Sequence, residues 1–397
     1  MVKNNKPTIQ LTETHQISRN HRFFDDCDRL TFLSKNLWNA TNYAVRQYYQ
    51  KTGKHLSYNK VNKLFTDENQ KDYRALPAKV SKGTQRMLEK AYSSFFSKRK
   101  KHLTGVEKPG YKHKTNGRQV VHYERGAIST KIKGYVKLSQ TDILIKTDKN
   151  VDFVRIVPKF DFFVIEIGYT VPLPVPSATT GKGTASIDLG LGNLLTVTSN
   201  VMQPVIISGK TVTHINKYSS RLLTHAKTKT VKSSHLTKAI YRKRRNKLKD
   251  YFHKTSRFLV NTWVNNNIEN VVVGYNVNWK FKNTIQNFSK VAYRTFLDIL
   301  TYKCQLAGIS IIEIEESYSS RASFYDLDPL PKLNSKKIPK FSGKRLKRGI
   351  YKTKNNLLVN ADINGSLNIL RKSKLWHKNM WQDCVSHSLE PVIKYRD

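Results

Sequence analysis

The sequence predicts a multidomain α+β protein with a helical unit, a small β-barrel or sandwich, and an α/β domain, in that order. Three observations predict it. Apolar residues recur at helical spacing before residue 104, short runs of Val, Ile, Tyr and Phe follow from about residue 105, and strand-like runs alternate with helical stretches after residue 184. A chain of 397 residues is long enough for two or three such domains.

The charge of the chain is strongly one-sided. Lys and Arg number 71 and Asp and Glu only 28, which gives a formal net charge of +43. Hydrophobic residues make up 38% of the chain, so its composition is not that of a disordered protein. A compact protein with this charge repels itself unless a polyanion neutralises it. We therefore expect a nucleic acid as the partner.

Several protein classes are excluded. No run approaches about 18 uncharged apolar residues, and the start MVKNNKPTIQ lacks the apolar core of a secretory signal, so we expect a soluble intracellular protein. Cys27, Cys304 and Cys384 are far apart and form no CxxC pair. Their spacing excludes a disulfide framework and a zinc site of ordinary spacing.

The helical unit is expected at residues 21–104. Apolar residues recur every three or four positions from about Arg22 to Gln50 and again from Ala78 to Phe95. The second stretch follows Pro77, and proline is common at a helix start. Both stretches have basic polar faces.

The strand-rich segment runs from about residue 105 to residue 175. Its short apolar runs, such as YVKLS, FVRIV and FFVIEIGY, are bounded by Gly, Asp, Asn and Pro, which favours a small barrel or sandwich. The following residues PLPVPSATTGKGT have the composition of a linker, which we place at 176–183.

The C-terminal domain is expected at residues 184–375, with a tail at 376–397. Strands are indicated at ASIDLGLGNLLTVTSN, ISGKTV, VVVGYN and ISIIEIEES, and helices at about 216–257, 291–307 and after Asp362. Three strands, a helix, a strand, a helix, a strand and a last helix form the order of an RNase H-like fold.

Two aspartates lie where chemistry is expected. Asp188 ends the first of these strands before a glycine-rich turn, and Asp362 lies where the last helix begins. An N-cap role would explain Asp362 taken alone. Carboxylates delivered from distant chain positions to one end of a sheet are, however, what a two-metal phosphodiesterase requires, with Mg²⁺ ions about 3.5–4 Å apart. The pair predicts a site for two Mg²⁺ ions, which Mn²⁺ can also occupy.

Five segments, in their order and spacing, resemble the C-terminal half of the TnpB family, the OrfB proteins of bacterial insertion sequences. They are SIDLGLGNLLTV, VVVGYNVNWK, EESYSSRASFYDLDPLP, FSGKRLKRGIY and NADINGSLNILRK, and LPAKVSKGTQRMLEKAYSSFF resembles the family's helical lobe more weakly. The resemblance implies an RNA-guided DNA endonuclease with a RuvC-type nuclease domain. It also implies a wedge-like β-barrel, residues 1–20 and 105–175, with an inserted helical recognition lobe.

The resemblance also implies the partners. They are a guide RNA transcribed from the element's end and a double-stranded target DNA with a short adjacent motif. The expected location is the bacterial cytoplasm, in association with the nucleoid.

Carried over by position, Asp188 and Asp362 match the first and third RuvC aspartates. Gly274 stands where most members of the family place the second-motif glutamate, so the site is either inactive or rebuilt. A subset of the family resembles this chain in carrying a relocated glutamate one strand later.

The last predicted strand offers two candidates for that glutamate. Because side chains alternate along a strand, Ile312, Ile314 and Glu316 share one face, and Glu316 continues this apolar face toward the catalytic edge. Glu316 is therefore the expected third catalytic and metal-binding residue. Glu315 is the fallback, since a β-bulge would exchange the two faces. Ordinary surface acids remain the alternative.

Many members of the family insert a four-cysteine zinc ribbon between the second and third motifs. Residues 321–357 of this chain contain no cysteine, so no zinc is expected. A basic segment, KKIPKFSGKRLKRGIYK, stands in its place. It is either a solvated charge run or a guide that leads the DNA strand toward the metals.

The remaining candidates are cations and aromatic residues suited to a guide–target heteroduplex and to single strands. Cations lie all round the stretch KAIYRKRRNKLKDYFHKTSR, in which HKTSR matches the family's HKxSR pattern. A solvated helix, a structural histidine and core aromatics are the alternatives. The predicted nucleic-acid-binding residues are Thr84, Gln85, Arg86, Arg242, Arg244, Arg245, His253, Lys254, Arg257, Trp279, Lys280, Tyr318, Ser320, Arg321, Lys344, Arg345, Lys347 and Arg348.

The sequence thus predicts an RNA-guided, Mg²⁺-dependent endodeoxyribonuclease of the TnpB type. Gly274 favours one alternative, a nuclease-inactive RNA-guided DNA-binding repressor. A second alternative is a DDE-type transposase, which uses the same metal chemistry.

Overall fold

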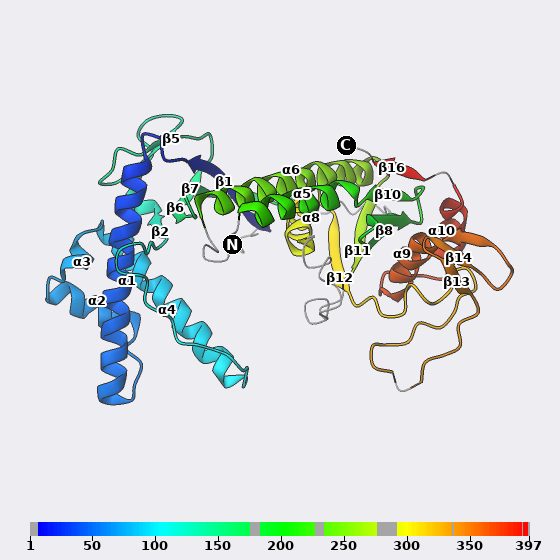
Figure 1. The fold of residues 1–397 in the computed structure, drawn as a ribbon, viewed down its shortest axis with the longest axis horizontal. Coiled ribbons are helices and arrows are strands. Elements are labelled where there is room, and N and C mark those ends of the chain that lie inside the picture. Colours follow the sequence, from blue (N-terminus) through cyan, green and yellow to red (C-terminus); the bar gives the residue numbers. More distant parts are fainter. Residues whose placement is uncertain are drawn as a thin grey trace, which may run out of the picture. The chain divides into compact units, whose positions relative to one another are not determined.

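The computed structural model describes residues 7–174, 183–226, 234–275, 292–335, 337–390 and 392–395. The chain divides into two compact units, an N-terminal unit of Thr8–Pro172 and a C-terminal unit built mainly from Leu173 onward. Each unit contains both helices and strands, so the predicted multidomain α+β class is confirmed (Figure 1).

The strands of the N-terminal unit form two separate sheets. The first is antiparallel with the order β1-β7-β6-β2, and the second contains β3, β4 and β5, which pair only with one another. The predicted barrel is corrected here: within the described residues the strands do not close into one cylinder. The strands are β1 (Thr8–Ile17), β2 (Val121–Glu124), β3 (Ile128–Ser129), β4 (Tyr135–Leu138), β5 (Leu144–Lys146), β6 (Val151–Pro158) and β7 (Phe163–Pro172).

Four helices complete this unit. The two predicted helices are observed as α1 and α4, whereas two short helices between them were not predicted. Alpha-helical spacing places Leu30, Leu37 and Val45 of α1 in the core, and the helix ends at Gly53, whose φ of 67° suits a left-handed cap. The helices are α1 (Phe24–Thr52), α2 (Tyr58–Asp67), α3 (Lys71–Arg74) and α4 (Ala78–Lys100).

The C-terminal unit is built on one six-stranded sheet with the order β12-β11-β8-β9-β10-β16. Strand β9 is antiparallel to β8 and β10, whereas β8, β11 and β12 are mutually parallel. The predicted succession of strands is observed, with one correction: of the predicted strand ISGKTV only the first two residues belong to β10, and Lys210–Val212 begin α5. Strand β16 adds an edge to the sheet. The strands are β8 (Gly183–Leu189), β9 (Asn193–Ser199), β10 (Val205–Ser208), β11 (Ile268–Gly274), β12 (Ser310–Ile314) and β16 (Ile393–Tyr395).

Helices cover both faces of this sheet. Val271 and Val273 belong to one apolar cluster with residues of α6 and α8, whereas Val272 lies in a second cluster with α9, as alternation along a strand requires. The helices are α5 (Lys210–Ala226), α6 (His235–Asn265), α8 (Tyr293–Leu306), α9 (Ala361–Lys372) and α10 (Met380–Ser388).

The predicted basic segment contributes β13 (Lys344–Lys347) and β14 (Ile350–Lys352) to a small antiparallel sheet, whose third strand, β15 (Leu358–Asn360), follows the segment. Strand β15 leads directly into α9. Cys27, Cys304 and Cys384 are all buried free thiols. Among the described residues, no helix has the length and apolar character needed to cross a bilayer.

Candidate active site and nucleic-acid interface

Asp188 lies at the carboxyl end of the central strand β8. Its carboxylate rests against α9, because a Cβ atom built on Gly365 would lie 3.0 Å from Asp188 Oδ2. Burial and then the nearby Asp362 carboxylate raise the pKa of Asp188 from 3.8 to about 7, although Arg345 acts in the opposite direction. A carboxyl group this perturbed at a strand end is typical of a functional site.

Asp362 is held in the first turn of α9. Asn360 is the N-cap, and its side-chain oxygen accepts hydrogen bonds from the backbone N–H groups of Asp362 and Ile363. Asp362 is therefore not the cap, and its carboxylate is available for other contacts. Asn193 Nδ2 donates to its Oδ2 at 2.8 Å, and Arg345 Nη2 lies 3.4 Å from its Oδ1.

Glu316 and Ile369 border the space that a side chain at Gly274 would need. A Cβ atom built on Gly274 would lie 3.2 Å from Glu316 Oε2 and 2.4 Å from Cδ1 of the fully buried Ile369. Burial and then the charges of Asp188 and Glu316 raise the pKa of Tyr293. The end of β11 thus has the Glu316 carboxylate beside it, and the buried Tyr293 lies within electrostatic reach of both acids.

Glu315 is engaged elsewhere. Lys372 Nζ donates to its Oε2 at 2.9 Å, and both the backbone N–H and the hydroxyl of Ser317 donate to its Oε1. Burial alone would raise the pKa of Glu315, but these hydrogen bonds hold the pKa below its usual value. Glu313 forms an ion pair with Arg294 at 2.9 Å. Glu313 and Glu315 thus each have a cationic partner, on β12 and just after it.

Small polar residues let α9 approach the sheet closely. The hydroxyls of Ser186 on β8, Thr198 on β9 and Ser366 on α9 form a buried hydrogen-bonded cluster. Asn364 and Asn368, also buried, donate to backbone carbonyls of the loop that follows Glu316. One helix thereby fixes both Asp362 and the segment after the third carboxylate.

The donor set suits a hard cation. Carboxylate oxygens are the ligands that Mg²⁺ prefers, and the pKa of Asp188 reports that Asp362 is near. In the described part of the chain, however, no three His, Cys, Asp or Glu groups already stand close enough together to hold a metal. Asp188 and Asp362 form a pair of nearby acids, and Glu316 follows β12, which β11 separates from β8.

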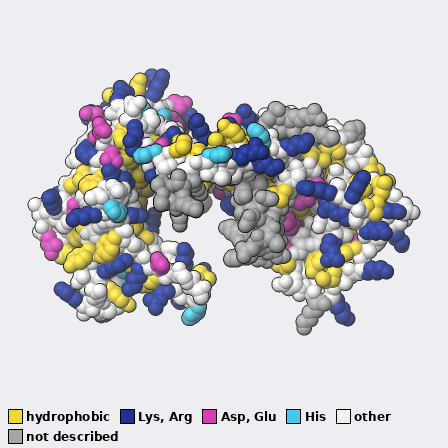
Figure 2. Space-filling model, viewed as in Figure 1, with side chains coloured by type: hydrophobic (Ala, Val, Ile, Leu, Met, Phe, Trp, Pro, Cys, Tyr) yellow, Lys and Arg dark blue, Asp and Glu magenta, His cyan; other side chains and the backbone are white. Residues whose placement is uncertain are grey.

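Exposed cations border these acids. All four predicted cations of the basic segment, Lys344, Arg345, Lys347 and Arg348, are exposed. A Cβ atom on Gly192, in the turn after Asp188, would lie 2.7 Å from Arg348 Nη2. Figure 2 shows Lys and Arg spread over the visible face, whereas Asp and Glu are sparse. An open hollow beside this turn is lined by residues of that turn and of α5, with Lys210, Lys217, Arg221 and Arg348 as its cations.

Helix α6 brings three predicted residues together. His253, Lys254 and Arg257 line a second open hollow with Lys303 of α8. Burial and then Arg257 lower the pKa of Lys303 to about 8, and burial and then Lys303 lower the pKa of His253. Nearer the start of α6, Arg242 is partly buried, Arg245 is exposed, and Arg244 donates from Nε to Asn216 at 2.8 Å.

The aromatic candidates have different outcomes. Tyr318 has a positive φ of 66°, and its ring is tilted by 38° to that of Phe341, with the centroids 6.4 Å apart. The Arg321 guanidinium lies 5.5 Å from the centre of the Phe341 ring. Ser320 between them is exposed. Trp279 and Lys280 lie outside the described residues.

In the N-terminal unit, Thr84 and Gln85 have internal partners. Thr84 is 0% exposed and hydrogen-bonds to Ser34, and Gln85 is 1% exposed and accepts from Asn62. Their burial corrects the picture of two accessible polar groups, because neither side chain reaches solvent here. Arg86 is exposed, with an ion pair to Glu124 at 2.7 Å.

Sequence reasoning missed two residues of the candidate active site. Asn193 could not be predicted, because no sequence pattern indicates that the start of β9 lies next to Asp362. Tyr293 follows a long segment without a clear pattern, and only the fold brings it beside Asp188.

Two family models match the chain. A model described as a probable transposase, OrfB_IS605, matches residues 164–280, and the TNB domain of Cas12f1-like proteins matches residues 293–369. The resemblance to the TnpB (OrfB) family is therefore confirmed. No curated protein matches the sequence.

Solved structures resemble the chain at low sequence identity. One of them is a cryo-EM structure of a Cas12f1–sgRNA–target DNA complex, with which this chain shares 13% sequence identity and a TM-score of 0.53. The match covers 87% of this chain and 82% of that chain. A CRISPR-Cas12f ternary complex is 13% identical with a TM-score of 0.36, covering 87% and 81%. The mini-RNA-guided endonuclease CRISPR-Cas_phi3 is 10% identical with a TM-score of 0.47, covering 91% and 92%. The first of these shows a shared fold.

Proposed function

Because segments of this chain match the TnpB (OrfB) and Cas12f1-like families, we propose that the protein is an RNA-guided DNA endonuclease. It hydrolyses phosphodiester bonds of target DNA next to a short adjacent motif. The observation that carries the proposal is the carboxylate of Glu316 in the space beside Gly274, on the same sheet edge as Asp188. The fold of a Cas12f1 complex with sgRNA and target DNA supports the same two classes of partner.

The carboxylates have defined places in this proposal. Parallel strands β8, β11 and β12 end at one edge of the sheet, so Asp188 and Glu316 lie on the side where β11 ends. Asp188, Glu316 and Asp362 would hold two Mg²⁺ ions, which supply an activated water and stabilise the leaving oxygen. Asn193 orients Asp362 through its hydrogen bond. In this proposal the six-stranded sheet and its helices form an RNase H-like domain of the RuvC type.

The cations surround this edge with positive charge. Arg345 and Arg348 lie against the two chain segments that carry the aspartates, so they can steer a DNA phosphate toward them. His253, Lys254 and Arg257 form a second contact region on α6. A heteroduplex presents phosphates on both strands and requires contacts over a wide surface.

Gly274 alone favours a nuclease-inactive RNA-guided repressor. A cleavage site that had decayed would not need a glutamate near this position, and here the Glu316 carboxylate lies close to it. The presence of both Asp188 and Asp362 likewise supports an active nuclease over a repressor. The repressor and the transposase therefore enter as outcomes of one experiment.

The experiment compares variants of the protein purified with its co-expressed guide RNA. A plasmid carrying a matching sequence is supplied with Mg²⁺, and both cutting and RNA retention are measured. We expect Asp188→Ala and Glu316→Ala to abolish cutting without loss of RNA. Glu313→Ala and Glu315→Gln are the matched controls and should keep cutting.

Each other outcome identifies a different protein. Guided binding without any cutting by the wild type would indicate a repressor. Joined DNA strands would indicate a transposase. Cutting unaffected by Glu316→Ala would remove Glu316 as the third ligand and leave the proposed enzyme without its second-motif acid.

A further inference from the structure

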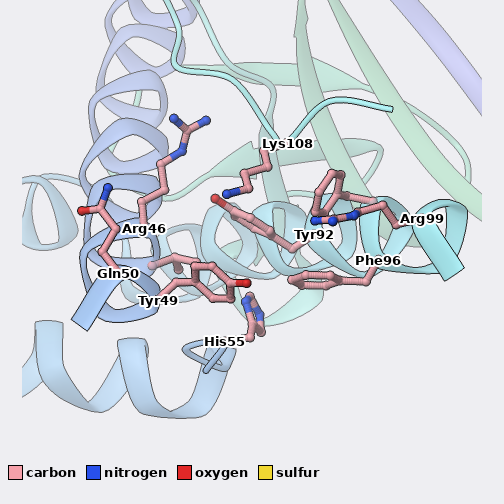
Figure 3. Close-up of a pocket in the computed structure, with 10 residues that line it drawn as sticks. Arg46, Tyr49, Gln50, His55, Tyr92, Phe96, Arg99 and Lys108 are labelled. Carbon is pink, nitrogen blue, oxygen red and sulfur yellow. The ribbon is translucent and has the colours of Figure 1, made fainter. Parts of the chain in front are cut away.

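The N-terminal unit contains a pocket whose residues all precede the acids of the C-terminal sheet in the sequence. This pocket has no role in the chemistry proposed above. It is formed between the C-terminal half of α1 and the C-terminal half of α4, and Lys108 closes one side (Figure 3). Its floor is apolar and rigid, since Val45, Tyr92 and Phe95 are buried core residues.

The wall of the pocket is aromatic. The rings of His55 and Tyr92 have centroids 5.3 Å apart, those of His55 and Phe96 5.4 Å, and those of Tyr92 and Phe96 6.1 Å. Tyr49 and Phe96 form the rim and are 42% and 39% exposed. Large aromatic faces at a rim keep contact area available for a planar ligand.

The same pocket is positively charged. Arg46, Arg99 and Lys108 line it, and its described lining contains no acidic residue, although Glu89 contacts the lining residue His55 at 2.9 Å. The Nε atom of Arg46 is buried without a hydrogen-bond partner, whereas its Nη2 donates to the backbone carbonyl of Pro109 at 2.8 Å. The guanidinium lies 4.7 Å from the centre of the Tyr111 ring. Lys108 Nζ lies 5.2 Å from the centre of the Tyr49 ring. An anion with a flat ring would meet both kinds of group at once.

We infer that this pocket binds one unpaired nucleotide of the RNA. The base stacks on Tyr49 and Phe96, and its phosphate meets Arg46 and Lys108. Sequence-tolerant binding of single strands combines base stacking with a cationic groove, and RNA is recognised mainly through unpaired bases splayed onto aromatic side chains. The inference rests on the proposed function only in taking a bound RNA as the source of the nucleotide.

The first measurement needs no guide. The full-length protein is mixed at high salt with a short single-stranded oligoribonucleotide that carries 4-thiouridine, then irradiated, and the crosslinked peptides are identified. We expect crosslinks at Tyr49 or Phe96. A DNA strand of the same sequence, carrying 4-thiothymidine, is expected to crosslink there more weakly. Equal crosslinking of the DNA would overturn the assignment to RNA, and absence of both crosslinks would overturn the pocket.

Affinity provides the second measurement. Stacking of one base is worth about 1–3 kcal/mol, so Tyr49→Ala or Phe96→Ala should weaken binding of the oligoribonucleotide by about 5- to 150-fold. Tyr43→Ala is the matched control, because Tyr43 lies on the same helix, is 60% exposed and does not line the pocket. Lys108→Gln leaves the rings in place and should lower the slope of log affinity against log salt by about 1. Equal losses for Tyr43→Ala and Tyr49→Ala would contradict the inference.

Guided plasmid cleavage separates this inference from the proposed function. If the wild type cuts guided DNA while the pocket variants bind RNA normally, the pocket inference alone fails. If crosslinks map to the pocket while no guided cutting or binding occurs, the proposed function alone fails.

Discussion

At the scale of single residues, the candidate active site holds two carboxylates, those of Asp188 and Asp362, near each other. Asp188 and Asp362 are close enough for the second carboxylate to raise the pKa of the first. Arg345 and a backbone hydrogen bond from Leu189 lower that pKa and offset the rise only in part. A pair of acids held together without full compensation destabilises the folded protein. A divalent cation between them would reverse the sign of that interaction.

Asp188→Asn is expected to stabilise the protein in the presence of a chelator and to abolish cutting with Mg²⁺. The folded pKa of Asp188, about 7, lies above its ordinary value of 3.8, so the folded state binds the proton more tightly. The carboxylate therefore destabilises the fold above about pH 7, and this penalty disappears as the pH falls toward 4. The gain from Asp188→Asn should be larger at pH 8 than at pH 5 in thermal unfolding.

Asp142→Asn is the control for this prediction, since Asp142 is an exposed acid of the N-terminal unit. It should change the melting temperature little at either pH. A gain from Asp188→Asn that is the same at both pH values would show that the buried charge is not its cause.

Gly274→Ala is expected to lower the free energy of unfolding by about 1–3 kcal/mol, the usual cost of overpacking a core. The added Cβ atom would lie 2.4 Å from Ile369 Cδ1, and Ile369 is fully buried and cannot swing away. Ile369→Val removes that methyl group, so the double variant should lose less stability than the two single variants together. Urea unfolding of the four proteins measures the coupling, and strictly additive losses would refute the contact.

At the scale of elements, the sequence could predict those whose pattern is local. Helices α1 and α4, most of the strands of the C-terminal sheet and the faces of β12 follow from periodicity, and Ile312 and Ile314 do lie in the cluster with α9. The separate sheet of β3–β5 could not be predicted, because strand pairing is set by distant partners. Glu316 could be predicted as a candidate ligand from the alternation of side chains along the strand. Its position beside Gly274 could not be predicted, because it depends on how β11 and β12 pair.

Asn360→Ala tests how the start of α9 places Asp362. Loss of an N-cap costs about 0.5–2 kcal/mol, so the free energy of unfolding should fall by this amount. Cutting should fall as well, because Asp362 begins the same turn and its backbone N–H loses its partner. Ser234→Ala, which removes the N-cap of α6, should cost similar stability without this loss of cutting. Equal effects of both variants on cutting would contradict the positioning role.

The hollow between α6 and α8 should bind nucleic acid in a pH-dependent way. Lys303, whose pKa of about 8 lies below the ordinary 10.5, is largely protonated at pH 7 and largely neutral at pH 9. RNA affinity should therefore fall between these pH values as one cation is lost. Lys303→Arg should remove that part of the pH dependence, because arginine keeps its charge. Lys254→Arg on the rim should leave the fall unchanged, and an identical fall in Lys303→Arg would exclude Lys303 as its source.

At the scale of the whole molecule, internal pairing cannot neutralise the charge. The chain has 71 Lys and Arg and only 28 Asp and Glu, so most cations lack an acidic partner even if every acid forms an ion pair. Composition could predict this excess, but not how the cations are placed. The structure places some of them beside the candidate active site, some in the hollow on α6, and some around the aromatic pocket of the N-terminal unit.

The guide RNA should therefore be a main source of stability for the complete protein. Ligand bound at 100 times its dissociation constant adds about 2.7 kcal/mol, and neutralised repulsion acts in the same direction. We expect the co-purified RNA to raise the melting temperature strongly at low salt. A protein that makes six to ten phosphate contacts loses about 10³–10⁵ in affinity between 50 and 200 mM salt, so the gain should shrink over that range. An unrelated RNA of equal length is the control: it should stabilise at low salt but lose its effect sooner, because it makes the charge contacts without the specific ones. Equal salt dependence of the two RNAs would mean that the charge binds any polyanion and that the protein does not select its guide.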